Sequence, residues 1–257
     1  NTVTTYRHRT RLIGGLLFFE YNDWQKEPNK LMQTSIPHNN RYTCLYVYYS
    51  EHSINISRKN TKMTEKEKMA RQMLYDANYD KELINDRNKA KDLCFEYNGI
   101  RPSDVEKQQK LLKRLLGKTK NNFCIVAPFW CDYGYNIEIG ENFFANHNLV
   151  ILDGAKVTFG DNVFIAPNCG FHTAGHPIDA ERRNQGLEYA YSISVGDDVW
   201  IGAGVQVMPG VSIGSNVVIG GGSVVVKDIP DNSVAVGNPC RVIRSITEED
   251  KKKSWDR

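Results

Sequence analysis

A six-residue repeat between Ser194 and Asp228 constrains the fold more than any other feature of this chain. From Val195 onward, every sixth position up to Val225 holds a β-branched aliphatic residue, and a second aliphatic series starts two positions earlier at Ile193. The two series are Val195, Ile201, Val207, Ile213, Ile219 and Val225, and Ile193, Val199, Val205, Val211 and Val217. A period of six fits neither an α-helix, with a period of about 3.6, nor a simple strand, with a period of about two. It predicts a hexapeptide solenoid, in which each unit buries its aliphatic face only by stacking on the next unit.

The repeat extends towards the N-terminus and is interrupted once. It begins near Phe123, and early units are visible at 137–140, 157–160 and 163–167. Residues 169–191 depart from the sixfold rule and carry His172 and His176, after which the repeat resumes at Ile193 and ends near Pro230. A loop that leaves a stacked array has no packing role, so this segment is a natural place for function.

Three helices are predicted before the solenoid. Thr64-Glu65-Lys66-Glu67 has the pattern of a capping box, and the helix that it opens is expected to continue through Met73 and Leu74. A second helix is expected over 80–97, ended by Asn98-Gly99, and a third over 105–116, ended by Gly117. We therefore expect a helical cap at residues 63–120, a solenoid domain at 121–246 and a tail at 247–257.

Residues 1–62 differ in character from the rest of the chain. They are rich in Tyr, Asn, Thr and His and show neither helical nor sixfold periodicity. We expect a poorly defined extension here, disordered or artefactual in origin. A strand-forming appendage around Tyr42–Tyr49 is the competing interpretation.

Composition and charge exclude some classes of function. The formal net charge of +3 over 257 residues is too small to indicate a nucleic-acid partner. No apolar run reaches the roughly 18 residues that a membrane helix needs, so we expect no membrane association. The six cysteines form no CxxC pair, which favours a reduced, cytoplasmic protein.

Between Met63 and Ile246 the chain resembles the maltose and galactoside O-acetyltransferases, which are hexapeptide-repeat acyltransferases. The matching segments are Met73-Leu74-Tyr75-Asp76, Asp132-Tyr133-Gly134-Tyr135-Asn136, Phe144-Ala145-Asn146-His147-Asn148, Ile165-Ala166-Pro167-Asn168, Thr173-Ala174-Gly175-His176-Pro177-Ile178, Asp198-Val199-Trp200-Ile201-Gly202 and Gly237-Asn238-Pro239-Cys240-Arg241-Val242-Ile243-Arg244. The resemblance implies a mainly β fold, a left-handed parallel β-helix with a small N-terminal helical cap. It also implies a homotrimer with active sites between neighbouring subunits, acetyl-CoA as co-substrate and no metal. The implied acceptor is a hydroxyl group of maltose, glucose or a galactoside.

The resemblance also implies the catalytic residues. His176 lies in the His-Pro motif that carries the family's base, and an imidazole with a pKa near 6.5 suits removal of a hydroxyl proton at neutral pH. Glu188 is a candidate to orient His176 or to stabilise its charged form, as carboxylates do in other base dyads. Asn146 matches the family asparagine that binds the acceptor near the reacting hydroxyl.

Four further residues fall at family positions that contact the acceptor. They are Asp76, Arg87, Tyr135 and Asp153. Tyr135 replaces a smaller residue found in some relatives, and Gly154 stands where one branch has an acidic residue. These departures leave the identity of the acceptor open.

Seven residues match the family's cofactor positions: Trp200, Ala203, Gly221, Val226, Lys227, Arg241 and Arg244. Small residues on a flat coil would let the pantetheine arm lie against the backbone, and the basic side chains would meet phosphate groups. The N–H of Ala203 would stabilise the oxyanion that forms during transfer.

Four other interpretations stay open at this level. His147, His172 and His176 could together bind zinc, as three histidines do in the γ-class carbonic anhydrases, which share the repeat. The acceptor could be a xenobiotic or an amino acid. An acyl intermediate on Cys169 is a minor alternative to direct transfer. A non-catalytic scaffold is disfavoured, because His176 and the Arg241/Arg244 pair are both present.

Overall fold

The computed structural model of the chain describes residues 11–13, 16–18, 32–38, 41–47 and 63–254. The chain divides into two compact units, residues 1–60 and 61–257. In the first unit, β1 (Arg11–Ile13) pairs antiparallel with β2 (Leu16–Phe18), and β3 (Met32–His38) pairs antiparallel with β4 (Arg41–Val47). The strand predicted around Tyr42–Tyr49 coincides with β4 as far as Val47, and its last two residues lie outside the described part of the chain. The other expectations for residues 1–62 also concern residues that are not described.

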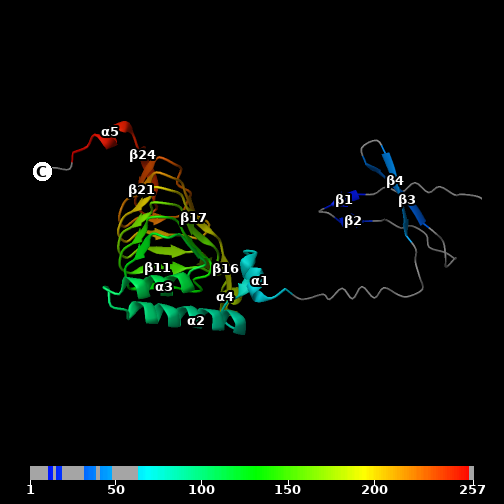
Figure 1. Ribbon diagram of the computed structural model, residues 1–257, viewed down its shortest axis with the longest axis horizontal. Helices are drawn as coiled ribbons and strands as arrows, with labels where there is room; N and C mark the ends of the chain where they lie inside the picture. Colours follow the sequence, from blue (N-terminus) through cyan, green and yellow to red (C-terminus); the bar gives the residue numbers. More distant parts are fainter. Residues whose placement is uncertain (1–10, 14–15, 19–31, 39–40, 48–62, 255–257) are drawn as a thin grey trace, which may run out of the picture. The chain divides into compact units, whose positions relative to one another are not determined.

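The second unit is a parallel β-solenoid of about six turns with helices at its N-terminal end, which confirms the predicted fold class (Figure 1). Its strands form three faces, which the chain visits in a fixed order. The first face holds β7 (Phe123–Ile125), β10 (Phe143–Ala145), β13 (Phe164–Ile165), β18 (Trp200–Ile201), β21 (Val217–Ile219), β23 (Ser233–Val236) and the antiparallel β24 (Arg241–Ser245). The second face holds β8 (Phe129–Cys131), β11 (Leu149–Leu152), β14 (Gly170–His172), β19 (Gln206–Val207) and β22 (Val224–Val225). The third face holds β6 (Lys118–Thr119), β9 (Ile137–Ile139), β12 (Val157–Phe159), β17 (Ile193–Val195) and β20 (Ser212–Ile213).

The faces meet at three corners. The first corner joins the first face to the second, the second corner joins the second face to the third, and the third corner returns the chain to the first face one coil further on. All residues of the two aliphatic series point into the solenoid and are buried. They stack in register, as when Ile201 pairs with Ile165 on one side and Ile219 on the other. The sixfold period is therefore one inward-pointing pair of aliphatic residues per face.

The interruption inserts residues without changing the stacking register. On the first face, Trp200 pairs with Val218, a step of 18 residues (218 − 200). Phe164 pairs with Trp200, a step of 36 residues (200 − 164), so the interruption adds 18 residues to one coil. It leaves the solenoid after β14 rather than at Cys169. Residues 170–172 still pair with the preceding coil, and residues 170 and 171 also pair with the following coil.

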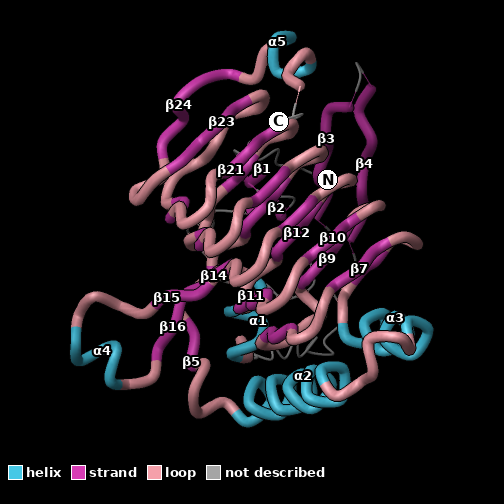
Figure 2. Tube along the Cα trace, turned by 90° about the vertical axis from the view of Figure 1, so that its left-hand side faces the viewer, coloured by secondary structure: helices cyan, strands magenta, loops and turns pink. Residues whose placement is uncertain are grey.

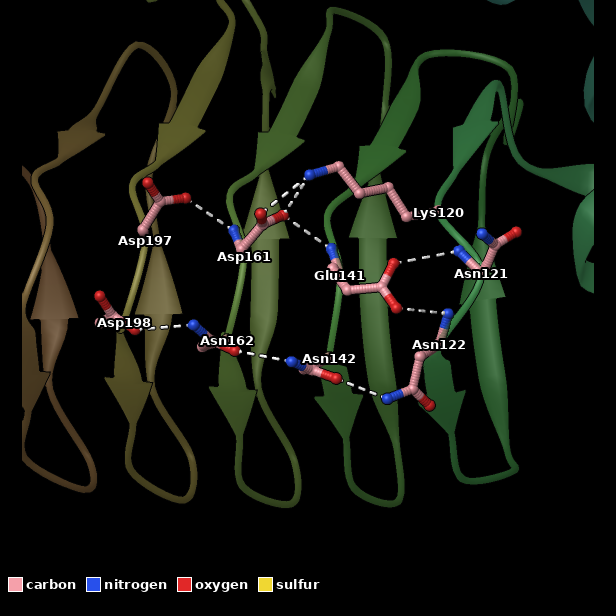
Figure 3. Close-up of polar contacts among 9 residues, drawn as sticks. All are labelled: Lys120, Asn121, Asn122, Glu141, Asn142, Asp161, Asn162, Asp197 and Asp198. Carbon is pink, nitrogen blue, oxygen red and sulfur yellow. Dashed lines mark hydrogen bonds and ion pairs between the residues drawn. The ribbon is translucent and has the colours of Figure 1, made fainter.

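The third corner shows why the repeat contains asparagine and aspartate (Figure 3). Asn142, Asn162 and Asp198 have φ values of 55°, 57° and 59°, a left-handed conformation that Asn and Asp tolerate better than most residues. Their side chains form a ladder, in which the Asn142 amide donates to Asn162 and the Asn162 amide donates to Asp198, each at 2.9 Å. Beside this ladder, the Asp161 carboxylate accepts from the N–H of Glu141 at 2.7 Å. Each coil is thus joined to the next by side-chain hydrogen bonds.

The three predicted helices are present at the N-terminal end of the solenoid (Figure 1). They are α1 (Glu65–Ala70), α2 (Lys81–Asn98) and α3 (Val105–Leu115). The predicted capping box is confirmed, because the Glu67 N–H donates to Thr64 Oγ1 at 3.1 Å and the Thr64 N–H donates to Glu67 Oε2 at 2.9 Å. Asn98 at the end of α2 exchanges two side-chain hydrogen bonds with the backbone of Phe129, which attaches the cap to the first strand of the second face.

The predicted continuation of the first helix through Met73 and Leu74 is wrong. The helix ends at Ala70, and Gln72 adopts a left-handed conformation with a φ of 55°. The chain then forms β5 (Tyr75–Asp76), which pairs antiparallel with β16 (Leu187–Ala190). Burial of Tyr75 and this pairing compete with helix continuation, and both depend on residues far away in the sequence.

The interruption is more ordered than the predicted loop. It contains β15 (Ala174–Gly175), α4 (Ala180–Asn184) and β16, and the strands form a three-stranded antiparallel sheet in the order β15–β16–β5. In the tail, α5 covers Glu248–Lys251.

We predict that Gly140→Ala destabilises the solenoid and that Gly99→Ala does not. A Cβ on Gly140 would lie 2.1 Å from the carbonyl oxygen of Gly160 in the next coil, and backbone atoms cannot yield as a flexible side chain can. Such overpacking typically costs about 1–3 kcal/mol. A Cβ on Gly99 would meet its nearest atoms at 3.7 Å, an ordinary contact. Thermal unfolding should show a clearly lower Tm for Gly140→Ala alone, and equal Tm values for the two variants would contradict the stacking described here.

Candidate active site

The sheet β15–β16–β5 brings together residues that are far apart in the sequence (Figure 2). It extends from the second corner of the solenoid, where the interruption begins and ends. Leu187 pairs with Asp76 and Glu188 pairs with Tyr75, while β15 leads directly into His176. The predicted base, its predicted carboxylate partner and the predicted acceptor contact Asp76 are therefore held by one small sheet.

A backbone carbonyl determines which nitrogen of His176 is free. His176 Nδ1 lies 2.9 Å from the carbonyl oxygen of Leu187. Because a carbonyl can only accept a hydrogen bond, Nδ1 must carry the proton, and Nε2 of the neutral ring is left as an acceptor. The side chain is exposed. The arrangement leaves an unprotonated imidazole nitrogen facing solvent, as a general base requires.

Hydrogen bonds to backbone groups stabilise the loop after His176. Arg183 Nη1 donates to the carbonyl oxygen of Ile178 at 2.8 Å and to that of Pro177 at 3.2 Å. Asp179 caps α4 by accepting from the Arg182 N–H at 2.9 Å. Asn78, which follows β5, donates to the carbonyl oxygen of Gly186 at 3.1 Å. These contacts stabilise the segment between His176 and β16, and the sequence analysis did not assign Arg183 this function.

Glu188 is hydrogen-bonded to Tyr75 and not to His176. Its carboxylate accepts from the Tyr75 hydroxyl at 2.5 Å, and the described contacts include no hydrogen bond between Glu188 and the His176 ring. Burial raises the pKa of Glu188 above its ordinary value, while the hydrogen bond from Tyr75 and the positive charges of His176 and Arg87 oppose that rise. Gly175 pairs with Tyr189 across β15 and β16, so His176 and Glu188 hold the next positions along the two chains.

The other predicted acceptor contacts lie at the same corner, but two of them already have protein partners. Arg87 donates to the Tyr133 hydroxyl at 2.7 Å and to the carbonyl oxygen of Ala77. One carboxylate oxygen of Asp76, Oδ1, accepts from the backbone N–H groups of residues 78 and 79 at 3.1 and 2.9 Å. Tyr135 is more open, with 39% of its surface exposed, and its ring lies 5.4 Å from that of Tyr133.

The prediction that Asp153 contacts the acceptor is contradicted. Its side chain is completely buried, and its carboxylate accepts from the N–H groups of Asp132 at 3.0 Å and Tyr133 at 2.8 Å. A weaker contact joins it to the Asn136 N–H at 3.4 Å. Asp153 therefore shapes the turn that presents Tyr133 and Tyr135. Sequence position placed it near the site but could not reveal that its carboxylate points inward.

The structure does not bring Asn146 to His176 within one chain. Asn146 lies at the first corner, where its Oδ1 accepts from the His147 N–H at 2.8 Å. Ala203 and Gly221 lie at the same corner in later coils, and the N–H of Gly222 donates to the carbonyl oxygen of Ala203 at 2.7 Å. These residues and His176 are at different corners of the solenoid.

The remaining residues predicted to bind the cofactor are also spread over the solenoid. Trp200 points outward from the first face with 57% of its surface exposed. Val226 and Lys227 lie at the second corner, and Arg241 and Arg244 lie on β24. The guanidinium of Arg244 forms two bonds of 2.8 Å with the carboxylate of Asp250, so it is already paired in this structure.

The three histidines of the zinc interpretation do not converge within one chain. His147 Nδ1 lies 2.6 Å from the carbonyl oxygen of Ala127, and His172 Nε2 lies 2.7 Å from Gln206 Oε1. His176 is held by Leu187, as described above. Within residues 63–254, no group of three metal-ligating side chains is close enough to bind an ion.

Cys169 is poorly suited to act as a nucleophile. Only 2% of its surface is exposed, and burial raises the pKa of its thiol. Its Sγ lies 3.2 Å from the carbonyl oxygen of Gly202, inside the solenoid. Because the thiolate is the reactive form, this environment disfavours the acyl-cysteine alternative.

The fold and these residues define a hexapeptide-repeat transferase, and two family profiles agree with that class. The maltose acetyltransferase hexapeptide capping motif matches residues 68–120, and the bacterial transferase hexapeptide profile with six repeats matches residues 192–227. The chain is 62% identical over 177 residues to YJL218W of Saccharomyces cerevisiae, a protein provisionally named an acetyltransferase. That match covers 69% of this chain and 90% of the yeast protein.

Solved structures give the same result. A maltose O-acetyltransferase from Clostridium difficile 630 is 51% identical with a TM-score of 0.70, over 72% of this chain and 99% of that one. A galactoside acetyltransferase in complex with coenzyme A is 43% identical with a TM-score of 0.72, over 76% of this chain and 97% of that one. The chain belongs to the maltose and galactoside O-acetyltransferase family, and it is an acetyl-CoA-dependent O-acetyltransferase. In the described part of the chain, none of the helices has the length and apolarity needed to cross a membrane.

We predict that Asp153→Asn changes how stability depends on pH. Burial raises the pKa of Asp153 from 3.8 to about 7, so the folded protein holds a proton there that the unfolded chain releases. The stability that this residue contributes is fully present below pH 4 and is lost as the pH rises towards 7, by up to about 4 kcal/mol. Asparagine does not titrate and should not show this loss. Thermal unfolding from pH 4 to pH 7 should therefore show wild type losing stability relative to the variant, and parallel Tm curves would contradict this prediction.

Proposed function

We propose that the protein transfers the acetyl group of acetyl-CoA directly to a hydroxyl group of a glucosyl, galactosyl or maltosyl compound, with His176 as general base. The observation that carries the proposal is the hydrogen bond between His176 Nδ1 and the Leu187 carbonyl, which leaves Nε2 as an exposed acceptor. The similarity to maltose and galactoside acetyltransferases supports a sugar as the acceptor. A cytoplasmic location stays a prediction from the cysteine pattern.

In the proposed reaction, Nε2 of His176 accepts the hydroxyl proton while the acceptor oxygen attacks the thioester carbonyl carbon. The new C–O bond produces a tetrahedral intermediate, whose collapse breaks the C–S bond. The thiolate that leaves takes the proton from the imidazolium, so the base is restored and no covalent enzyme intermediate forms. The nearby carboxylate of Glu188 would stabilise the imidazolium while it exists.

The first corner fits the donor side of this reaction. Within the described residues, no backbone carbonyl accepts from the N–H of Ala203, so this donor is available to an oxyanion. Gly221 lies directly against Ala203, and a Cβ there would be 3.1 Å from the carbonyl oxygen of Ala203. Glycine at position 221 therefore keeps side-chain atoms away from the Ala203 backbone, which suits a pantetheine arm along this corner. Lys227, Arg241 and Arg244 are exposed and would meet phosphate groups, Arg244 by exchanging its bonds to Asp250.

We further propose that each active site forms between two copies of the chain in a homotrimer. Asn146 and Ala203 lie at the first corner and His176 lies at the second, so one chain does not place them around a single acceptor hydroxyl. The outward residues of the first face give it an apolar surface, with Phe164 and Trp200 half exposed. The outward residues of the third face include Ser194 and Ser212 and are polar. An apolar face beside the first corner fits contact with another subunit.

The first test is thiol release from acetyl-CoA with and without a panel of sugars. Sugar-dependent release by wild type is expected, and His176→Ala should reduce kcat about 10²–10⁴-fold, the usual effect of removing a general base. Size-exclusion chromatography and thermal unfolding would show that the variant still folds and assembles. Full kcat in a folded His176→Ala protein would contradict the assignment. Release with an antibiotic or an amino acid, but with no sugar, would replace the proposed acceptor.

We predict that two inactive variants complement each other if the active site is shared. His176→Ala and Asn146→Ala should each be nearly inactive as homotrimers. When the two are co-expressed, a site that combines the first corner of the His176→Ala chain with the second corner of the Asn146→Ala chain is intact. Affinity-purified mixed trimers should therefore recover a substantial fraction of wild-type activity. Mixed trimers as inactive as the parents would mean that one chain supplies both residues to each site, and would contradict the shared site.

A further inference from the structure

Tyr75 is a buried residue of the candidate site to which neither the sequence analysis nor the proposed reaction assigns a function. None of its surface is exposed, and its hydroxyl donates to Glu188 Oε1 at 2.5 Å. The two residues are also direct neighbours in the pairing of β5 with β16. The hydroxyl thus connects the helical cap to the carboxylate beside His176.

The surroundings of this pair leave little freedom for another arrangement. Gly154 lies behind it, where a Cβ would be 2.9 Å from the Tyr75 hydroxyl oxygen and 3.4 Å from Glu188 Oε1. A side chain at position 154 would therefore displace the pair. The glycine at this position, where one branch of the family has an acidic residue, leaves room for the Tyr75 ring and the Glu188 carboxylate together.

The charges around Glu188 come from several elements. Asp132 follows β8 and disfavours the ionised carboxylate, while His176 and Arg87 favour it. Arg87 is largely engaged with Tyr133 and Ala77, so it is not directed at Glu188 alone. Asp76 lies on β5 opposite Leu187. In this environment, Tyr75 supplies the one hydrogen bond to the Glu188 side chain that the described residues provide.

We propose that Tyr75 is a positioning residue whose hydroxyl holds the Glu188 carboxylate beside His176, so that the proton taken up by the imidazole is stabilised. The proposal rests on the function proposed above for His176. A hydrogen bond from a neutral hydroxyl to a carboxylate favours the ionised form and fixes its direction. Tyr75 would thus set the strength of the base without touching either substrate.

The direction of the effect follows from the charges. Without the Tyr75 hydroxyl, the pKa of Glu188, already raised by burial, rises further, and less of the residue is ionised at neutral pH. His176 then loses part of a neighbouring negative charge, so its protonated form is less stabilised. The acid limb of the kcat/KM profile, which reports deprotonation of the base in the free enzyme, should move to lower pH. The weaker base should also lower kcat on the plateau.

The test compares Tyr75→Phe, Glu188→Gln and the double variant with wild type. Tyr97→Phe is the matched control. Tyr97 lies on α2 and is also completely buried, and its hydroxyl donates to the carbonyl oxygen of Ile125 on β7, away from the site. We expect Tyr75→Phe to lower kcat about tenfold, in line with the loss of one hydrogen bond to a charged group. The double variant should be no slower than Glu188→Gln alone. Tyr97→Phe should lower Tm without moving the pH profile.

A second readout does not depend on activity. The NMR titration of His176 in protein labelled at histidine should show its transition at lower pH in Tyr75→Phe and in Glu188→Gln than in wild type, and unmoved in Tyr97→Phe. An unchanged His176 titration and an unmoved pH profile in Tyr75→Phe would overturn the proposal. Wild type that releases no thiol with any acceptor would overturn the proposed function, while the titration would still decide whether Tyr75 acts on His176 through Glu188.

Discussion

The stacking of one inward-pointing aliphatic pair on the pair above it is the constraint on which the rest of this structure depends. Ile201 contacts the next coil through Ile219 and the previous coil through Ile165, and neither contact survives a shift of register. The interruption after β14 is possible because it leaves the pairing of Phe164 with Trp200 intact. Inserted residues can therefore bind ligands or catalyse a reaction without disturbing the packing of the core.

The same constraint decides where the chemistry can lie. Inward positions are filled by aliphatic side chains, so groups that meet ligands must come from outward positions, corners or insertions. The second corner carries the inserted sheet with His176, and the first corner carries Asn146 and the open backbone at Ala203. A solenoid with its chemistry divided between corners gains a complete site when a second copy supplies the missing corner. This is the physical reason for connecting oligomer formation with catalysis in the proposed function.

The regular part of the fold could be predicted from the sequence, because its signals are local. The sixfold aliphatic series and the capping box at Thr64 each depend on residues a few positions apart. The pairing of β5 with β16 could not be predicted in this way, since it joins Tyr75 to a residue 113 positions later in the chain. That pairing ends the first helix early and creates the contact with Glu188. Asp153 shows a related limit, because a motif position does not reveal whether a carboxylate points outward or caps backbone N–H groups inside.

An experimental structure with coenzyme A and an acceptor sugar would test the central claim most directly. The account predicts that a sugar hydroxyl lies within about 2.6–3.2 Å of His176 Nε2, with Nδ1 still bound to the Leu187 carbonyl. It also predicts that Asn146 in the same site comes from the neighbouring subunit. A sugar bound away from His176, or a site in which one chain supplies both Asn146 and His176, would contradict it.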